Sequence, residues 1–117
     1  MNDTERAQVW IAMSDLFLDT EIDYRYVANR ICRHSASELR SIFFGEVAPV
    51  CGPNLLSPVP PVWAGFEEES LVSEIRFMLA RSKESMLFRI GYKLKVLFYR
   101  WRFSEVWDEL EPYVKQS

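Results

Sequence analysis

The sequence predicts an all-α protein that forms one compact domain over residues 1–117. Apolar residues recur at helical spacings of three and four along most of the chain, and alternation with a period of two is almost absent. Capping residues precede several of these amphipathic segments. A chain of 117 residues with 49% hydrophobic side chains suits one domain with a core of its own. We therefore expect five or six helices.

Two helices are expected in the first third of the chain. The first covers residues 4–18 and begins at Thr4, whose hydroxyl can accept a hydrogen bond from a backbone N–H of the first turn. The second covers residues 23–33. Apolar side chains line one face of each helix: Val9, Trp10, Met13, Leu16 and Phe17 in the first, and Tyr24, Val27, Ala28 and Ile31 in the second.

A third helix is expected over residues 36–47, because Ser35 and Glu38 have the spacing of a capping box. We expect Pro49 to end it, since proline lacks the N–H that a helix needs. A long proline-rich loop over residues 48–66 follows. Its apolar side chains indicate that it packs against the body of the protein: Val50, Leu55, Leu56, Val59, Val62, Trp63 and Phe66.

The second half of the chain predicts up to three more helices. Glu67–Glu69 place acids at the start of a helix that ends near Arg81. A long helix follows over residues 85–101. A last helix is capped by Ser104 and limited in length by Pro112. The apolar stripe of the long helix consists of Leu87, Ile90, Leu94, Leu97, Phe98 and Trp101.

Charge is distributed unevenly along the chain. Residues 1–69 contain 11 acids and five arginines, whereas residues 76–102 contain eight cations and one acid. The basic segment is either a surface that binds an acidic protein or a phosphate backbone, or a solvated face whose cations pair with the acidic N-terminal helices. The net charge of −3 argues against nucleic acid as the partner, because no basic footprint covers the whole domain.

Candidate partner contacts lie at both charged poles. The four carboxylates at the acidic pole can present a decoy surface to a basic partner, or they can be a helix end and an N-cap. The cations and tyrosines at the basic pole can receive an acidic partner. The candidates are Asp15, Asp19, Glu21 and Asp23 at the acidic pole, and Arg89, Tyr92, Lys93 and Tyr99 at the basic pole. The excess of acids over bases in residues 1–69 favours the acidic pole as the interface.

Patterns typical of catalysis or metal binding are absent from the sequence. The single imidazole, His34, directly precedes the cap Ser35, and no P-loop, dinucleotide-binding, H-E-x-x-H or G-x-S-x-G motif occurs. Cys32 and His34 make a poor metal pair without further ligands, and Cys32 and Cys51 do not make a disulfide framework. We expect both cysteines to be buried free thiols, and a redox pair is the alternative. We therefore expect no catalytic residues, no cofactor and no metal.

Targeting signals are also absent from the sequence. The N-terminus lacks a basic region followed by an apolar run, and no apolar stretch approaches the ~18 residues that a membrane-spanning helix needs. We therefore expect a cytoplasmic protein with no membrane partner.

Three strings of the sequence resemble a family of small, stand-alone bacterial proteins of unknown function. They are LFLDTE at residues 16–21, EVAPVCGPNLLS at residues 46–57 and VWAGF at residues 62–66. The resemblance covers residues 8–80 most closely, and the family brings no assigned catalytic residues. It implies a bacterial origin and a single domain, a setting typical of immunity and antitoxin proteins.

The function we expect from these observations is binding. The favoured hypothesis is a cytoplasmic bacterial immunity protein that neutralises a secreted toxin by occluding its active site, with a cognate toxin or effector as its partner. The alternative is a regulatory or assembly module that homodimerises through its surplus aromatic side chains. An enzyme with an unfamiliar carboxylate site is the hypothesis that the sequence favours least.

Overall fold

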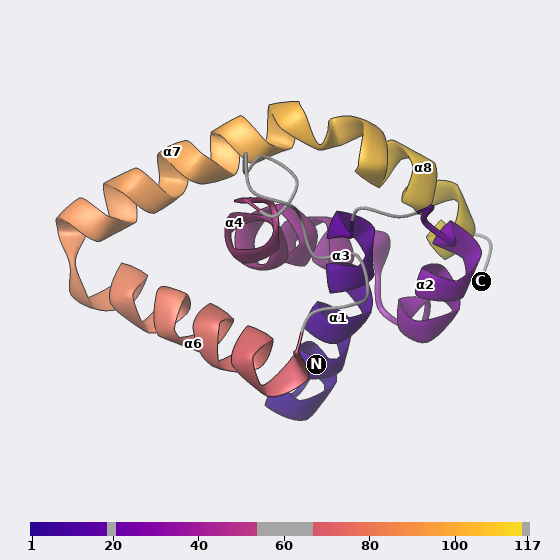
Figure 1. Cartoon of the computed structure of the whole chain (residues 1–117), viewed down its shortest axis with the longest axis horizontal. Helices are drawn as coiled ribbons and strands as arrows, with labels where there is room; N and C mark the ends of the chain where they lie inside the picture. Colours follow the sequence, from indigo (N-terminus) through magenta and orange to yellow (C-terminus); the bar gives the residue numbers. More distant parts are fainter. Residues whose placement is uncertain (19–20, 54–66, 116–117) are drawn as a thin grey trace.

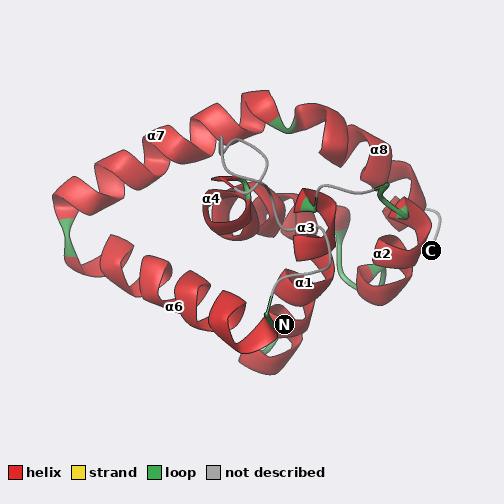
Figure 2. Ribbon diagram, in the orientation of Figure 1, coloured by secondary structure: helices red, strands yellow, loops and turns green. Residues whose placement is uncertain are grey.

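Helices make up most of a computed structural model of the protein, which describes residues 1–18, 21–53 and 67–115 (Figures 1 and 2). No strand occurs in these ranges, and the expected all-α class is confirmed. The elements are α1 (Asp3–Ser14), a 3-10 turn (Asp15–Phe17), α2 (Tyr24–Ile31), α3 (Ala36–Ile42), a π-helical turn (Phe43–Val47), α4 (Ala48–Cys51), α6 (Glu68–Glu84), α7 (Met86–Arg102) and α8 (Ser104–Lys115).

Capping side chains determine where the N-terminal helices begin. Asn2 caps α1, because its Oδ1 accepts a hydrogen bond from the backbone N–H of Glu5 at 2.7 Å, and Thr4 lies inside the first turn. Asp23 caps α2 in the same way, and the capping residue of α3 is Ser35, as the sequence predicted. The expected cap at Thr4 is therefore wrong by two residues, since asparagine caps a helix as well as serine or threonine does.

Two prolines that were expected to limit helices lie inside them. Helical backbone continues from α3 through the π-helical turn and α4 to Cys51, with Pro49 in the first turn of α4. Proline lacks the N–H that would bond the Gly45 carbonyl four residues earlier, and this carbonyl accepts a hydrogen bond from a side chain of α7, described below. The last helix, α8, runs past Pro112 to Lys115. We call the continuous helix over residues 36–51 the central helix.

The loop expected over residues 48–66 is helical at its start, where Ala48–Cys51 form α4. Residues 54–66 lie outside the described residues. The expected packing of this loop through Trp63 and Phe66 falls within that range.

The core lies where α1, α2, α8 and the central helix meet. Four aromatic rings gather at its centre: Phe43 stacks on Phe17 with ring centroids 5.3 Å apart, and Phe44 and Trp107 lie 4.8 and 5.9 Å from Phe43. The apolar face expected for residues 4–18 is buried here, which confirms that part of the prediction. Other fully buried side chains are Met13, Leu16, Ile31, Leu39, Ile42, Ile75, Phe103 and Leu110.

The helices α6 and α7 form a hairpin around the central helix. They meet at Ser85, and α7 then runs along one edge of the molecule towards α8 (Figure 1). Gly52, at the end of α4, allows α7 to approach closely. A Cβ atom at this position would lie 2.6 Å from the carbonyl oxygen of Ala48, 2.9 Å from Tyr99 Cε1 and 3.0 Å from Phe103 Cε2.

We expect Gly52→Ala to lower the free energy of unfolding by about 1–3 kcal/mol, the usual cost of overpacking. The matched control is Gly91→Ala, because a Cβ atom on this exposed glycine of α7 meets nothing within 4 Å. The control should raise stability by about 1 kcal/mol, since alanine favours a helix more than glycine does. Urea unfolding measures both variants, and equal stabilities would contradict the close contact between α4 and α7.

Tyr92 is a second anchor between α7 and the central helix. Its hydroxyl donates a hydrogen bond to the backbone carbonyl of Gly45. In an α-helix that carbonyl accepts from the N–H four residues on, but this residue is Pro49 and has no N–H. Burial raises the pKa of Tyr92, and the negative charge of Glu46 raises it further, so the hydroxyl stays protonated and able to donate. Tyr92 thus supplies a donor that the proline cannot.

We expect Tyr92→Phe to lower the free energy of unfolding by about 1–3 kcal/mol, because the Gly45 carbonyl loses this donor. Tyr26→Phe is the control, since Tyr26 lies on α2 with 55% of its surface exposed. The control should change stability by less than about 0.5 kcal/mol in the same urea titration. If both variants unfold together, the hydroxyl of Tyr92 does not hold α7 in place.

Candidate binding surface

The apolar stripe of α7 faces away from the core. Such a stripe ordinarily marks the side of a helix that packs inward. Here each of its side chains has between 45% and 82% of its surface exposed, whereas Tyr99 on the opposite side of the helix is 5% exposed. We call this surface the α7 crest; it consists of Met86, Leu87, Ile90, Leu94, Leu97, Phe98 and Trp101.

The side of α7 that packs inward carries the tyrosines. The ring of Tyr99 stacks on Phe103 with centroids 5.6 Å apart and lies over Gly52. Tyr92 reaches the Gly45 carbonyl, as described above. Tyr92 and Tyr99 were candidate partner contacts, but neither ring is fully exposed. Tyr99 is buried and Tyr92 is half-buried, because their hydroxyl-bearing rings fill the space beside the central helix.

The candidate cations of α7 have different surroundings. Arg89 is exposed, but its Nε donates to the carbonyl of Ser82 at 2.8 Å and its Nη2 to that of Lys83 at 3.1 Å. These carbonyls belong to the last turn of α6, where a cation also offsets the negative end of the helix dipole. Arg89 therefore fastens the hairpin. Lys93 is exposed and makes no hydrogen bond or ion pair with another described residue.

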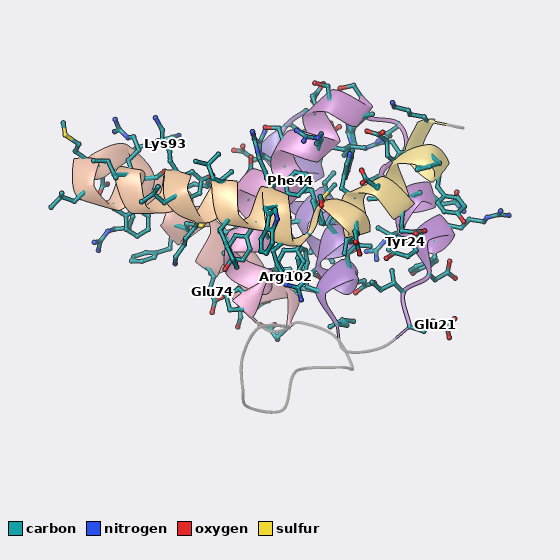
Figure 3. The ribbon with its side chains drawn as sticks, turned by 90° about the horizontal axis from the view of Figure 1, so that it is seen from above. Glu21, Tyr24, Phe44, Glu74, Lys93 and Arg102 are labelled. Atoms are coloured by element: carbon teal, nitrogen blue, oxygen red, sulfur yellow. The ribbon has the colours of Figure 1, made fainter. Side chains whose placement is uncertain are left out.

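The cations of α7 make no ion pair with the described acids of the N-terminal helices. This helix contains five cations and no acid. Among residues 1–18, 21–53 and 67–115, no ion pair within 4.0 Å involves a cation between residues 76 and 102. The cations of this segment are solvated, as one of the two interpretations expected, but the pairing with the N-terminal helices that it also expected is not seen among the described residues. In Figure 3, which looks down on α7, Lys93 and Arg102 lie on opposite sides of the helix, so that cations flank the α7 crest on both sides.

An open groove lies beside the α7 crest, between α7 and the central helix. Its volume is about 370 Å³, and its walls include Ser41, Gly45, Tyr92, Lys93, Leu97 and Arg100. A second hollow lies next to it towards α8, shares Ser41 and Arg100 with it, and adds Arg40 together with the ion pair of Lys115 and Glu111. Leu97 belongs to both the crest and the groove, so that an apolar surface and a basic groove adjoin each other.

The acidic pole has structural roles in the fold. Partial burial raises the pKa of Asp15, and the nearby charge of Arg30 lowers it by less, so that the net shift is upward. Arg30 Nη1 lies 3.7 Å from Asp15 Oδ2. Asp23 accepts a hydrogen bond from the backbone N–H of Tyr26 at 3.0 Å as the cap of α2. Glu21 is exposed, and Asp19 lies outside the described residues. These contacts match the interpretation of the cluster as a helix end and an N-cap.

The most buried charged side chain of the described residues is Glu46, which is 7% exposed. Its carboxylate accepts hydrogen bonds from Arg6 through Nε at 2.8 Å and through Nη2, and from Trp10 Nε1 at 2.8 Å. The ion pair ties α1 to the π-helical turn. Because both carboxylate oxygens are occupied, this arrangement is that of a structural ion pair.

The two thiols and the imidazole lie in separate places. Cys51 is buried, and burial raises the pKa of its thiol to about 12. Cys32 is half-buried, so the expectation of two buried thiols is wrong for this residue; both are free. His34 Nε2 lies 4.0 Å from a carboxylate oxygen of Glu5. The described ranges contain no group of three or more side chains that could hold a metal ion.

The described residues form an all-helical protein in which the α7 crest is a large exposed apolar face. The chain belongs to the family described as Domain of unknown function (DUF7079), whose model matches residues 4–113. This agrees with the expected resemblance to a family of unknown function. No curated protein and no solved structure matches the chain. Within the described parts of the chain, the helices are too short or too polar to span a bilayer.

The sequence contains a signal that could have located the α7 crest. Apolar and aromatic residues occupy two sides of α7, one centred on Leu94 and the other on Tyr92 and Tyr99. A single helix of a small domain can bury one side against the core. An excess of this kind indicates that one of the two sides is exposed, although it does not say which.

Proposed function

We propose that the chain is a non-catalytic protein-binding domain that acts as a cytoplasmic immunity protein and neutralises a secreted toxin by occluding its active site. The observation that supports this proposal is the α7 crest, which leaves seven large apolar side chains exposed on one helix. Contiguous apolar patches on soluble proteins mark interaction sites. Aromatic residues and methionine, which are enriched at protein interfaces, contribute Met86, Phe98 and Trp101.

The positive charge around the α7 crest favours a protein partner whose contacting surface is acidic. Lys93, Lys95 and Arg100 are exposed and, among the described residues, unpaired. An apolar centre within a charged rim is the usual anatomy of an interface, and the rim speeds association with a partner of opposite charge. At the acidic pole, in contrast, Asp15 and Asp23 have partners within the fold. We therefore place the interface at the basic pole.

The test is neutralisation of the toxic product of a neighbouring gene. Coproduction of the chain should restore growth, and the two proteins should form a 1:1 complex in size-exclusion chromatography. The crest variant Leu94→Asp with Leu97→Asp should lose both effects while its circular dichroism spectrum stays helical. Tyr26→Asp, on the exposed side of α2, is the matched control and should behave as the unchanged chain does. Restored growth without a complex would contradict the proposal.

A charge reversal at the acidic pole completes this test. Glu21→Lys is the variant of choice, because Glu21 is exposed, whereas Asp23→Lys would also remove the cap of α2. We expect this reversal to leave the complex intact. If it weakens binding by about tenfold or more while the crest variant binds normally, the interface lies at the acidic pole.

The alternative function is a regulatory or assembly module that forms homodimers, and the same crest favours it, because a second copy could cover the exposed apolar side chains. Sedimentation velocity at several concentrations distinguishes the two functions. A dimer that the crest variant disrupts, together with no neutralisation, would support the module and contradict the immunity proposal.

A further inference from the structure

We infer that the α7 crest and the adjoining groove receive an acidic amphipathic helix of the partner, with its apolar face on the crest and its carboxylates over Lys93 and Arg100. This inference rests on the proposed function in one respect, namely that the occupant is a protein. It names the chemistry of that occupant.

The shape of the α7 crest fits a helix. Its apolar residues recur at spacings of three and four from Met86 to Trp101, which forms one continuous seam along the helix. Sixteen residues of α-helix extend about 24 Å at 1.5 Å per residue, so a partner helix of about four turns covers the seam. Apolar side chains at such spacings pack against the matching seam of a second helix, as they do in a coiled coil.

Charge argues against a second copy of the chain as the occupant. Cations of α7 flank the α7 crest on both sides, and the helix contains no acid that could pair with them. Two copies that met crest to crest would bring like charges together along the whole seam. Flanking charges of one sign on both helices disfavour such pairing, while an acidic helix relieves the repulsion.

The groove argues against a membrane surface. Lys93 and Arg100 share their groove with Ser41 of the central helix, so these cations stand beside a recess and not on a flat face. A planar bilayer touches the α7 crest but does not follow the recess, whereas side chains of a partner helix can enter it. Moreover, the chain has a net charge of −3 in spite of the basic α7, which weakens its overall attraction to anionic lipid.

The experiment uses fluorescein-labelled synthetic peptides of about 18 residues, long enough to cover the seam. One peptide has a leucine seam flanked by glutamates, and its match has the same seam flanked by lysines. Fluorescence anisotropy with the full chain should show that the acidic peptide binds about tenfold or more tightly than the basic one. This preference should shrink as salt is added, since the pairs are solvent-exposed.

A charge swap separates recognition from a structural effect. Lys93→Glu with Arg100→Glu should weaken binding of the acidic peptide by about tenfold or more and should strengthen binding of the basic peptide. A variant that had merely lost its fold could not gain affinity for the basic peptide. The matched control is Arg76→Glu with Lys83→Glu on α6, two exposed cations that lie outside the groove. It should leave the preference unchanged.

Several outcomes would overturn the inference. Equal binding of both peptides, or of neither, would remove the acidic helix as the occupant. A crest-dependent dimer in sedimentation would assign the surface to a second copy, and binding to phosphatidylglycerol vesicles without peptide binding would assign it to a membrane. Neutralisation that depends on the crest without peptide binding would leave the proposed function standing and this inference wrong. If the peptides bind and respond to the charge swap as expected, but the chain neutralises no toxin, the preference for an acidic helix stands and the proposed immunity function is wrong.

Discussion

Trp107→Ala is expected to lower the free energy of unfolding by about 3–5 kcal/mol, the range for large-to-small changes at buried aromatic residues. Trp107 is 2% exposed and packs against Phe43 and Phe44 at the centre of the core. Its Nε1 also donates to the Glu111 carboxylate at 2.9 Å, so the indole is satisfied as well as buried. Urea unfolding followed by circular dichroism measures the loss.

Trp101→Ala provides the comparison, because the same substitution six residues earlier removes a side chain that is 74% exposed. It should change stability by less than about 0.5 kcal/mol. The difference between the two tryptophans tests the orientation of α7 directly. If Trp101→Ala were the more damaging variant, the α7 crest would be part of the core and the proposed interface would be wrong.

Glu46→Ala is expected to lower the free energy of unfolding by about 3 kcal/mol, at the lower end of the range for breaking a buried ion pair. The variant leaves Trp10 Nε1 without its acceptor and Arg6 without its counter-ion. The loss stays at the lower end because the Arg6 side chain is 40% exposed and water can reach it. Chemical unfolding at neutral pH provides the measurement.

The double variant Arg6→Met with Glu46→Leu is the control for this ion pair. Replacing both charges by apolar side chains of similar size is often neutral, because no unpaired charge remains. We expect it to be more stable than Glu46→Ala alone. A double variant that is less stable than Glu46→Ala would mean that the charges themselves, and not their mutual satisfaction, hold α1 against the central helix.

The sequence predicted the roles of residues that act locally and missed the roles of residues that depend on distant partners. The capping spacing of Ser35 and Glu38 predicted the start of α3, since a cap is a local interaction. Pro49 misled the prediction for the opposite reason. Its effect on the helix depended on a π-helical turn before it and on a hydroxyl from Tyr92, which lies 47 residues from Gly45. The ion pair of Glu46 with Arg6, 40 residues away, has no local pattern at all.

The sequence by itself determined the helical class, most helix positions and the inward faces of the N-terminal helices. Each of those helices has one apolar side, and the period of 3.6 residues identifies that side without knowledge of its neighbours. α7 has two such sides, and local periodicity alone does not identify which of them is buried in the core. The tertiary structure decided between them. The ring of Tyr99 packs over Gly52, and the hydroxyl of Tyr92 donates to the Gly45 carbonyl, so the tyrosines face inward and Leu94 and its neighbours face outward.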